Sequence, residues 1–302
     1  MKNTCIIICG PTAVGKTAIA IQLAQYFSTE IISFDSRQCF TEMNIGTAKP
    51  SAEELNTVKH YFINSHSIHD TVNAAVFEQY AMAKIEKIFL QHKVAIMVGG
   101  TGLYINAFCN GIDDVPAIDP SVRTAIVANY NNNGIEWLRE QVKKNDEQYF
   151  AKGEIFNPQR MMRALEVKMS TGKSILDFHS KKKKQHVFNI IKIGLELPRQ
   201  ELIERINRRV DIMMQQGLEA EAKSLLPHQH LNALQTVGYK ELFSYFENEI
   251  SLPQAIEAIK INTRQYAKRQ MTWFKKDETI QWLPPVFKEA LNGIESFAGL
   301  RS

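Results

Sequence analysis

Residues 10–17 read Gly-Pro-Thr-Ala-Val-Gly-Lys-Thr and match the phosphate-loop pattern Gly-x-x-x-x-Gly-Lys-Ser/Thr without a gap. An apolar run at residues 4–9 precedes the loop, and a segment with helical apolar spacing follows it. The backbone N–H groups of such a loop bind a diphosphate, helped by the positive end of the helix. We expect Lys16 to bridge phosphate oxygens and Thr17 to hold Mg²⁺ through its hydroxyl. The predicted diphosphate-binding residues are Gly10, Pro11, Thr12, Ala13, Val14, Gly15, Lys16 and Thr17.

Two further segments carry candidate catalytic groups where predicted strands end. Asp35 follows the apolar segment 30–34, and Thr101 lies in the Gly-Gly-Thr-Gly sequence that follows the apolar run 94–98. In an open parallel sheet, ligands bind outside the carboxyl ends of the strands, so both residues are expected beside the phosphate loop. A carboxylate there can act as a general base or as an indirect metal ligand, although Asp also caps turns. No carboxylate follows residues 94–98, which argues against an ATPase motor.

Arginines supply the remaining candidates, and each has an ordinary alternative. Arg205 and Arg209 lie four residues apart on a predicted helix, so they share a face and could clamp a diphosphate. With Glu201 nearby, a ladder of surface ion pairs is the alternative. Arg160 and Arg163 open another helix, a position that suits phosphate or base contact. Arg123 has a similar place after Asp119-Pro120.

The first 110 residues alternate predicted strands and helices, which indicates an α/β fold with a parallel sheet flanked by helices. The expected strands are 4–9, 30–34 and 94–98, and the expected helices are 17–27 and 74–90. From about residue 113 helices predominate, until a strand at 187–197 returns to the sheet and a helix runs to residue 216. The predicted domains are a P-loop core, 1–114 and 186–302, and a helical insertion domain, 115–185.

The charge and composition restrict the class of protein. Among 302 residues, 44% are hydrophobic and 23% charged, as in globular proteins. Residues 152–209 hold 14 Lys or Arg against 6 Asp or Glu, a net +8, while the rest carries −4. This excess indicates a phosphate-rich partner such as nucleic acid, or a solvated surface at the run Lys181–Lys184. No membrane span is expected, and four cysteines without a Cys-x-x-Cys pair favour a reducing cytoplasm.

Together the motifs resemble the bacterial tRNA dimethylallyltransferases, also called tRNA isopentenyltransferases. The resemblance runs from residue 10 to about residue 274. Its pieces are GPTAVGKT (10–17), DSRQ (35–38), GTAKP (46–50), GGTGLY (99–104), NPQRMMRALEV (157–167), RINRRVDIMMQQGLEAEA (205–222), GYKE (238–241) and TRQYAKRQMTWF (263–274). A chance match to so many ordered motifs is implausible.

The resemblance implies the reaction and a role for each matched residue. The phosphate loop would bind dimethylallyl diphosphate, and the acceptor would be the exocyclic amine of the adenosine 3′ to the tRNA anticodon. Asp35 would be the general base, Thr101 would position the reacting groups, and Arg209 would hold the leaving diphosphate beside Lys16. The insertion would grip the anticodon stem-loop, and the enzyme is expected to be a monomer. The matched tRNA-contact positions are Asp35, Ser36, Arg37, Gln38, Thr101, Arg123, Gln159, Arg160, Met161, Met162 and Arg163.

Two other functions stay open at this point. A small-molecule kinase with the same loop would consume ATP. A non-catalytic RNA-binding module would bind tRNA unaffected by Lys16→Ala and form no product. Alkyl transfer fits the residues because Lys16, Mg²⁺ and an arginine can neutralise a leaving diphosphate while Asp35 takes a proton.

Overall fold

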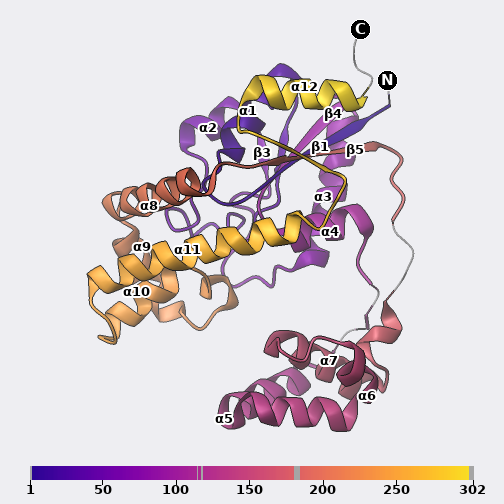
Figure 1. Cartoon of the computed structure of the whole chain (residues 1–302), viewed down its shortest axis with the longest axis vertical. Helices are drawn as coiled ribbons and strands as arrows, with labels where there is room; N and C mark the ends of the chain where they lie inside the picture. The colour runs from indigo at the N-terminus through magenta and orange to yellow at the C-terminus, as the bar shows by residue number, and fades with distance from the viewer. Residues whose placement is uncertain (1, 114, 117, 180–183, 299–302) are drawn as a thin grey trace. The chain divides into compact units, whose positions relative to one another are not determined.

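The computed structural model describes residues 2–113, 115, 116, 118–179 and 184–298. Within them, six strands form one parallel sheet in the order β3-β2-β4-β1-β5-β6 (Figure 1). The strands are β1 (Thr4–Cys9), β2 (Ile31–Ser33), β3 (His60–Tyr61), β4 (Val94–Val98), β5 (Asn189–Leu195) and β6 (Ile280–Leu283). The predicted P-loop α/β fold is therefore confirmed.

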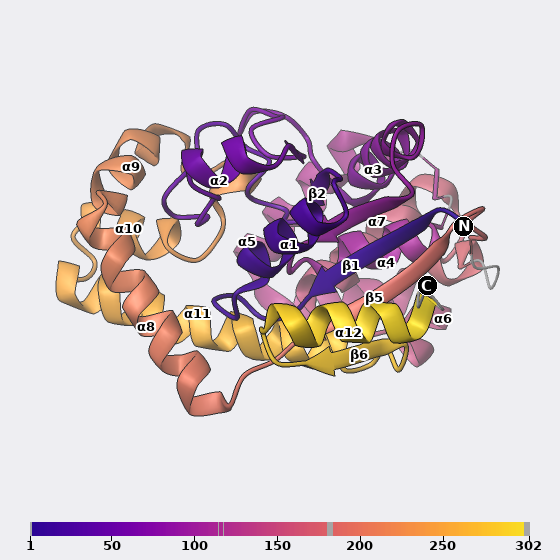
Figure 2. The ribbon, with the colours of Figure 1, turned by 90° about the horizontal axis from the view of Figure 1, so that it is seen from above.

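Helices cover both faces of the sheet. Every side chain of the central strand β1 is therefore buried. Ile6 and Ile8 pack with α1 (Lys16–Tyr26) and α12 (Phe287–Ala298), which lie over one face (Figure 2). Ile7 and the flanking cysteines pack with α3 (Ala74–Phe89), α4 (Gly102–Asn110) and α11 (Leu252–Phe274) on the other face. Residues that alternate along one strand thus build two separate cores.

The remaining core helices are α2 (Ala52–Thr57), α8 (Arg199–Gln215), α9 (Leu218–Leu225) and α10 (Tyr239–Phe246), with short 3₁₀ turns at Leu226–His228 and Asn232–Leu234. Helix α11 follows them and carries a side chain that bonds to the phosphate loop. Two strands, β3 and β6, were not among the expected ones. Strand β5 is shorter than the expected 187–197, and the helix after it starts at Arg199.

Residues 111–184 form a compact unit of their own, close to the predicted insertion 115–185. The unit holds α5 (Pro120–Asn145), α6 (Glu147–Lys152), α7 (Pro158–Thr171) and a 3₁₀ turn at Ile175–Phe178. Both long helices are capped, since the Asp119 and Asn157 side chains accept N–H bonds at the starts of α5 and α7. Gly134 interrupts α5 with φ of 76°, a left-handed angle that favours glycine.

The lysine run falls only partly within the described residues, since Lys181, Lys182 and Lys183 lie outside them. Among the residues that are described, no helix is both long and apolar enough to cross a membrane. The four cysteines, Cys5, Cys9, Cys39 and Cys109, are buried free thiols.

Candidate active site

The phosphate loop joins β1 to α1 through backbone angles that few residues tolerate. Gly10 has φ of 143°, and a Cβ there would lie 2.5 Å from the Leu195 carbonyl oxygen of β5. Gly15 has φ of 102° and precedes α1, whose first N–H groups receive no side-chain cap. The loop therefore presents uncapped N–H groups at a helix N-terminus, which is the arrangement that binds a phosphate.

Lys16 lies in a positively charged surrounding before any ligand binds. Its Nζ donates to the Pro11 carbonyl at 2.7 Å, so the side chain folds back over the loop. Burial lowers the pKa of Lys16 to about 8, and the neighbouring Arg209 adds to the fall while Asp35 opposes it. Lys16, Arg209 and Asp35 line one cavity, and an anionic ligand bound there would relieve the repulsion between the two cations.

Asp35 and Thr101 shape the turn that follows β2. One oxygen of Asp35, Oδ1, accepts the N–H groups of Arg37 at 2.8 Å and Gln38 at 3.3 Å. The other, Oδ2, has no hydrogen-bond partner among the described residues. Thr101 Oγ1 accepts the Ser36 N–H at 3.0 Å and donates to the Ser36 hydroxyl at 3.3 Å. Asp35 therefore caps the turn with one oxygen and keeps the second for other chemistry.

Gln270 of α11 joins the phosphate loop to the Gly-Gly-Thr-Gly loop after β4. Its Oε1 accepts the Thr12 N–H at 2.8 Å, and its Nε2 donates to the Gly100 carbonyl at 2.9 Å. A Cβ on Gly100 would lie 2.1 Å from that Nε2, so a side chain at this position would displace the amide from its bond. The motif containing Gln270 was recognised in the sequence, but no local pattern marks this residue as the bridge. The signal available in the sequence was Gly100, a glycine in the loop after a buried strand, which indicates that another group approaches the backbone there.

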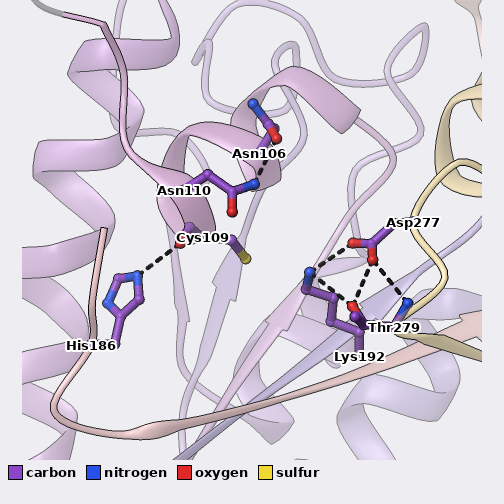
Figure 3. A network of polar contacts seen from close by, with 7 residues as sticks. All are labelled: Asn106, Cys109, Asn110, His186, Lys192, Asp277 and Thr279. Carbon is purple, nitrogen blue, oxygen red and sulfur yellow. Dashed lines mark hydrogen bonds and ion pairs between the residues drawn. The ribbon is translucent and has the colours of Figure 1, made fainter. Parts of the chain in front are cut away.

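The C-terminal end of α11 is fixed on β5 by a second set of contacts (Figure 3). Lys192 Nζ donates to Asp277 Oδ2 at 2.7 Å and to the Thr279 hydroxyl at 3.2 Å. Asp277 also accepts the Thr279 hydroxyl and N–H at 2.6 and 3.0 Å. Burial alone would raise the pKa of Asp277, but the bonds from Lys192 and Thr279 hold it below its ordinary value. This anchor holds the helix that carries Gln270.

The two candidate arginines of α8 have different partners. Arg205 is exposed and pairs with Glu201 at 2.8 Å, the contact that the ion-pair alternative expects. Arg209 donates to the Ala48 carbonyl at 3.4 Å, and both arginines line one cavity. Arg209, Lys16 and Asp35 line one cavity, and burial lowers the pKa of Arg209 while the charge of Asp35 opposes the fall.

Two adjoining cavities lie beside the phosphate loop, and Thr101 is not part of the lining of either. The larger, of about 840 Å³, is lined by Lys16, Thr17, Gln38 and Gly100 among others. The smaller, of about 730 Å³, has an apolar side that includes Val210, Leu218, Val237 and Ile259. Both are lined by Thr12, Asp35, Thr47, Ala48, Arg209, Met213 and Tyr266. Tyr266 was not predicted; burial, with the charge of Asp35, raises its pKa.

A family model described as IPP transferase matches residues 38–277 of the chain. The chain belongs to the IPP transferase family. It is 50% identical over 283 residues to the tRNA dimethylallyltransferase of Flavobacterium johnsoniae and 48% identical over 282 residues to that of Christiangramia forsetii. These alignments cover 92% and 93% of this chain, and the same shares of the two relatives.

Solved structures of the IPP transferase family share the fold. The full-length tRNA isopentenylpyrophosphate transferase of Bacillus halodurans matches with a TM-score of 0.71 and 35% identity, over 99% of this chain and 96% of that one. A eukaryotic dimethylallyltransferase acting on tRNA matches with a TM-score of 0.76 and 27% identity, over 99% and 77%. The predicted family and the predicted enzyme class, tRNA dimethylallyltransferase, are confirmed.

The insertion residues expected to contact tRNA make their described contacts within their own unit. Arg123 and Arg163 both approach the buried carboxylate of Glu166, at 3.0 and 3.5 Å, and Arg160 pairs with Glu154 at 2.7 Å. Each of these three guanidinium groups is partly exposed, with 43–56% of its side chain accessible.

Met161 and Met162 differ from their neighbours because both side chains are buried in the core of the insertion. Their burial gives them a packing role and does not favour direct contact with tRNA. Gln159 is exposed at the start of α7. Contact of all these residues with tRNA stays a prediction.

Proposed function

We propose that the protein transfers a dimethylallyl group from dimethylallyl diphosphate to the exocyclic N6 of the adenosine 3′ to the tRNA anticodon. The allylic carbon exchanges its bond to the diphosphate oxygen for a bond to N6. The diphosphate leaves with the electron pair of the broken bond, and N6 loses a proton. The observation that carries the proposal is that Lys16, Arg209 and Asp35 line one cavity.

The uncapped phosphate loop supports the proposed binding of the leaving diphosphate. Loop N–H groups, Lys16 and Arg209 would bind the leaving oxygens and stabilise the charge that develops there. Among the described residues, no cluster of three or more His, Cys, Asp or Glu side chains could hold a metal ion by itself. The Thr17 hydroxyl and the Asp35 carboxylate beside a diphosphate still fit Mg²⁺, because this ion uses few protein ligands and completes its shell with substrate oxygens and water. Thr17 would hold it, and it would supply further charge neutralisation.

The acceptor end is supported by the turn after β2. Asp35 Oδ1 is occupied by two N–H groups, which fixes the carboxylate and leaves Oδ2 to take the N6 proton. Thr101 would hold this turn through Ser36. The apolar side of the smaller cavity would receive the prenyl tail and exclude water from the reacting carbon. The adenosine must leave its stack to reach this point.

The other partner contacts complete the proposal. The exposed guanidinium groups of the insertion would bind the anticodon stem-loop through phosphates. We further propose that the enzyme acts as a monomer in the cytoplasm, where its four thiols stay reduced. Light scattering of the purified chain, alone and with tRNA, tests the monomer.

One reaction tests the activity. The protein is incubated with dimethylallyl diphosphate, Mg²⁺ and unmodified tRNA, the tRNA is digested, and the nucleosides are weighed by mass spectrometry. Adenosine heavier by one dimethylallyl group supports the proposal, and a parallel arm with ATP in place of the prenyl donor measures phosphoryl transfer. ATP consumption without alkylated adenosine would favour the kinase, and tRNA binding without either product would favour the binding module.

A further inference from the structure

The carboxylate of Glu221, on α9, holds a turn that lies far from it in the sequence. One oxygen, Oε2, accepts the N–H groups of Asn44 at 3.0 Å and Ile45 at 2.8 Å. The other, Oε1, accepts the Gly46 N–H at 2.9 Å and the Tyr239 hydroxyl at 2.7 Å. One side chain thus satisfies three consecutive backbone donors, and bonds to a charged acceptor are the strong ones.

The fit between the turn and its support is close. Tyr239 is completely buried, and a Cβ on Gly46 would lie 2.6–2.7 Å from its ring and hydroxyl. Burial and the charge of Glu221 together raise the pKa of Tyr239, so the hydroxyl stays protonated and donates to the carboxylate. The contacts with Glu221 of α9 and Tyr239 of α10 therefore fix the position of the turn against these two helices.

The next residues of the same turn hold two groups of the candidate active site. The carbonyl oxygens of Thr47 and Ala48 accept the Gln38 side-chain amide at 3.2 and 3.0 Å. The Ala48 carbonyl also accepts the Arg209 guanidinium. A displacement of the turn would therefore move both acceptor carbonyls away from the side chains that they orient.

We propose that Glu221 is a positioning residue for transfer, which acts by holding the 44–48 turn so that Ala48 orients Arg209 toward the diphosphate. The inference rests on the proposed function, because it needs Arg209 to bind the diphosphate. Glu221 itself contacts no reacting group; its effect passes through backbone N–H groups to a carbonyl two residues further on.

Glu221→Gln is the first test. The amide oxygen can still accept from Asn44 and Ile45, and its NH₂ can donate to Tyr239, but the Gly46 N–H loses its acceptor. We expect the dissociation constant for inorganic diphosphate with Mg²⁺ to rise about 10-fold, and single-turnover transfer to fall at least as much, as for loss of a bond to a charged group. Glu219→Gln, on the same helix, is the matched control, with both quantities expected within about twofold of wild type.

The decisive measurement is whether the effect passes through Arg209. In an Arg209→Ala background, Glu221→Gln should change diphosphate affinity by less than about twofold, because coupled residues are not additive. A merely structural role would weaken the protein equally in both backgrounds and would overturn the proposal, as would a Glu221→Gln variant that matches the control. Tyr239→Phe removes a single donor and keeps the ring, so it provides a milder test if Glu221→Gln does not fold. It should show a smaller loss of diphosphate affinity with the same dependence on Arg209.

Failure of the proposed function gives a different pattern. If wild type binds diphosphate but alkylates no tRNA, the proposed function is wrong, while an Arg209-dependent loss of affinity in Glu221→Gln still supports the positioning role. If wild type transfers normally and Glu221→Gln does too, the positioning role alone is wrong.

Discussion

Replacement of Asp35 by asparagine separates its two tasks, because the two carboxylate oxygens have different partners. Oδ1 accepts the N–H groups of Arg37 and Gln38, and the amide oxygen of the substituted side chain could accept both in the same way. The turn should therefore survive at a cost below about 1 kcal/mol, less than one ordinary hydrogen bond. The variant loses the oxygen that would take the N6 proton.

The expected loss follows from general-base catalysis. Single-turnover transfer should fall by about 10²–10⁴-fold in Asp35→Asn. The dissociation constants for tRNA and for dimethylallyl diphosphate should stay within about threefold, because the phosphate loop and the insertion are unchanged. Asp35→Ala is the comparison: it also removes the acceptor of two N–H groups, so its melting temperature should fall as well.

The assay is single-turnover transfer together with both dissociation constants across a Mg²⁺ titration. If Asp35 were an indirect metal ligand, the asparagine variant would bind diphosphate weakly and extra Mg²⁺ would restore the rate. That result would show that Asp35 acts as an indirect metal ligand and is not the general base. A near-normal rate at every Mg²⁺ concentration would refute a role in the mechanism altogether.

Three further outcomes test other parts of the site. Because the pKa of Lys16 is lowered to about 8, the free enzyme holds this side chain largely neutral at pH 9 and charged at pH 7, so the enzyme should take up a proton on binding diphosphate at pH 9 but little at pH 7, as calorimetry in two buffers would measure. Lys16→Ala should abolish this uptake and reduce transfer about 10²–10³-fold with tRNA affinity unchanged, and an equal loss of tRNA binding would contradict the division of roles. The tRNA affinity should fall steeply as the salt concentration rises. Replacing Arg160 and Arg163 together by Ala should reduce the slope of log affinity against log salt by up to about 0.7–0.9 for each phosphate that is no longer neutralised. A salt-independent affinity would mean that the charge excess is only a solvated surface. Gln270→Ala should lower the melting temperature and slow transfer about 10-fold or more by uncoupling the two loops, and a Gln270→Ala enzyme with wild-type rates would show that the bridge is dispensable.

The elements that local pattern determines were predictable from the sequence. Buried parallel strands are apolar runs, so β1 and β4 were expected within the bounds observed, and the phosphate loop between a strand and a helix followed from spacing alone. Strand β3 was not, because its two residues join the sheet only through pairing with Ile31 and Ile32. Such a strand is defined by tertiary contact and leaves no periodicity.

Charges were harder to assign than elements. The spacing of Arg205 and Arg209 puts both on one face of α8. Only their partners distinguish them, which are Glu201 for Arg205 and the Ala48 carbonyl for Arg209. The net charge of residues 152–209 includes Glu166 as one acid among six, but it does not show that this acid is buried beside Arg123 and Arg163. Sequence gives the number of charges, whereas their neighbours decide how many face a ligand.

The bond from Gln270 to Thr12 has a consequence for how the enzyme is made. The two residues are 258 positions apart, so the ribosome must add 258 residues after Thr12 before the phosphate loop receives its support. Strand β5, the neighbour of β1, also emerges only after the insertion. A nascent chain that stops before α11 can hold the loop sequence but not its bridge to Gly100. Termination before α11 should thus release fragments without transfer activity.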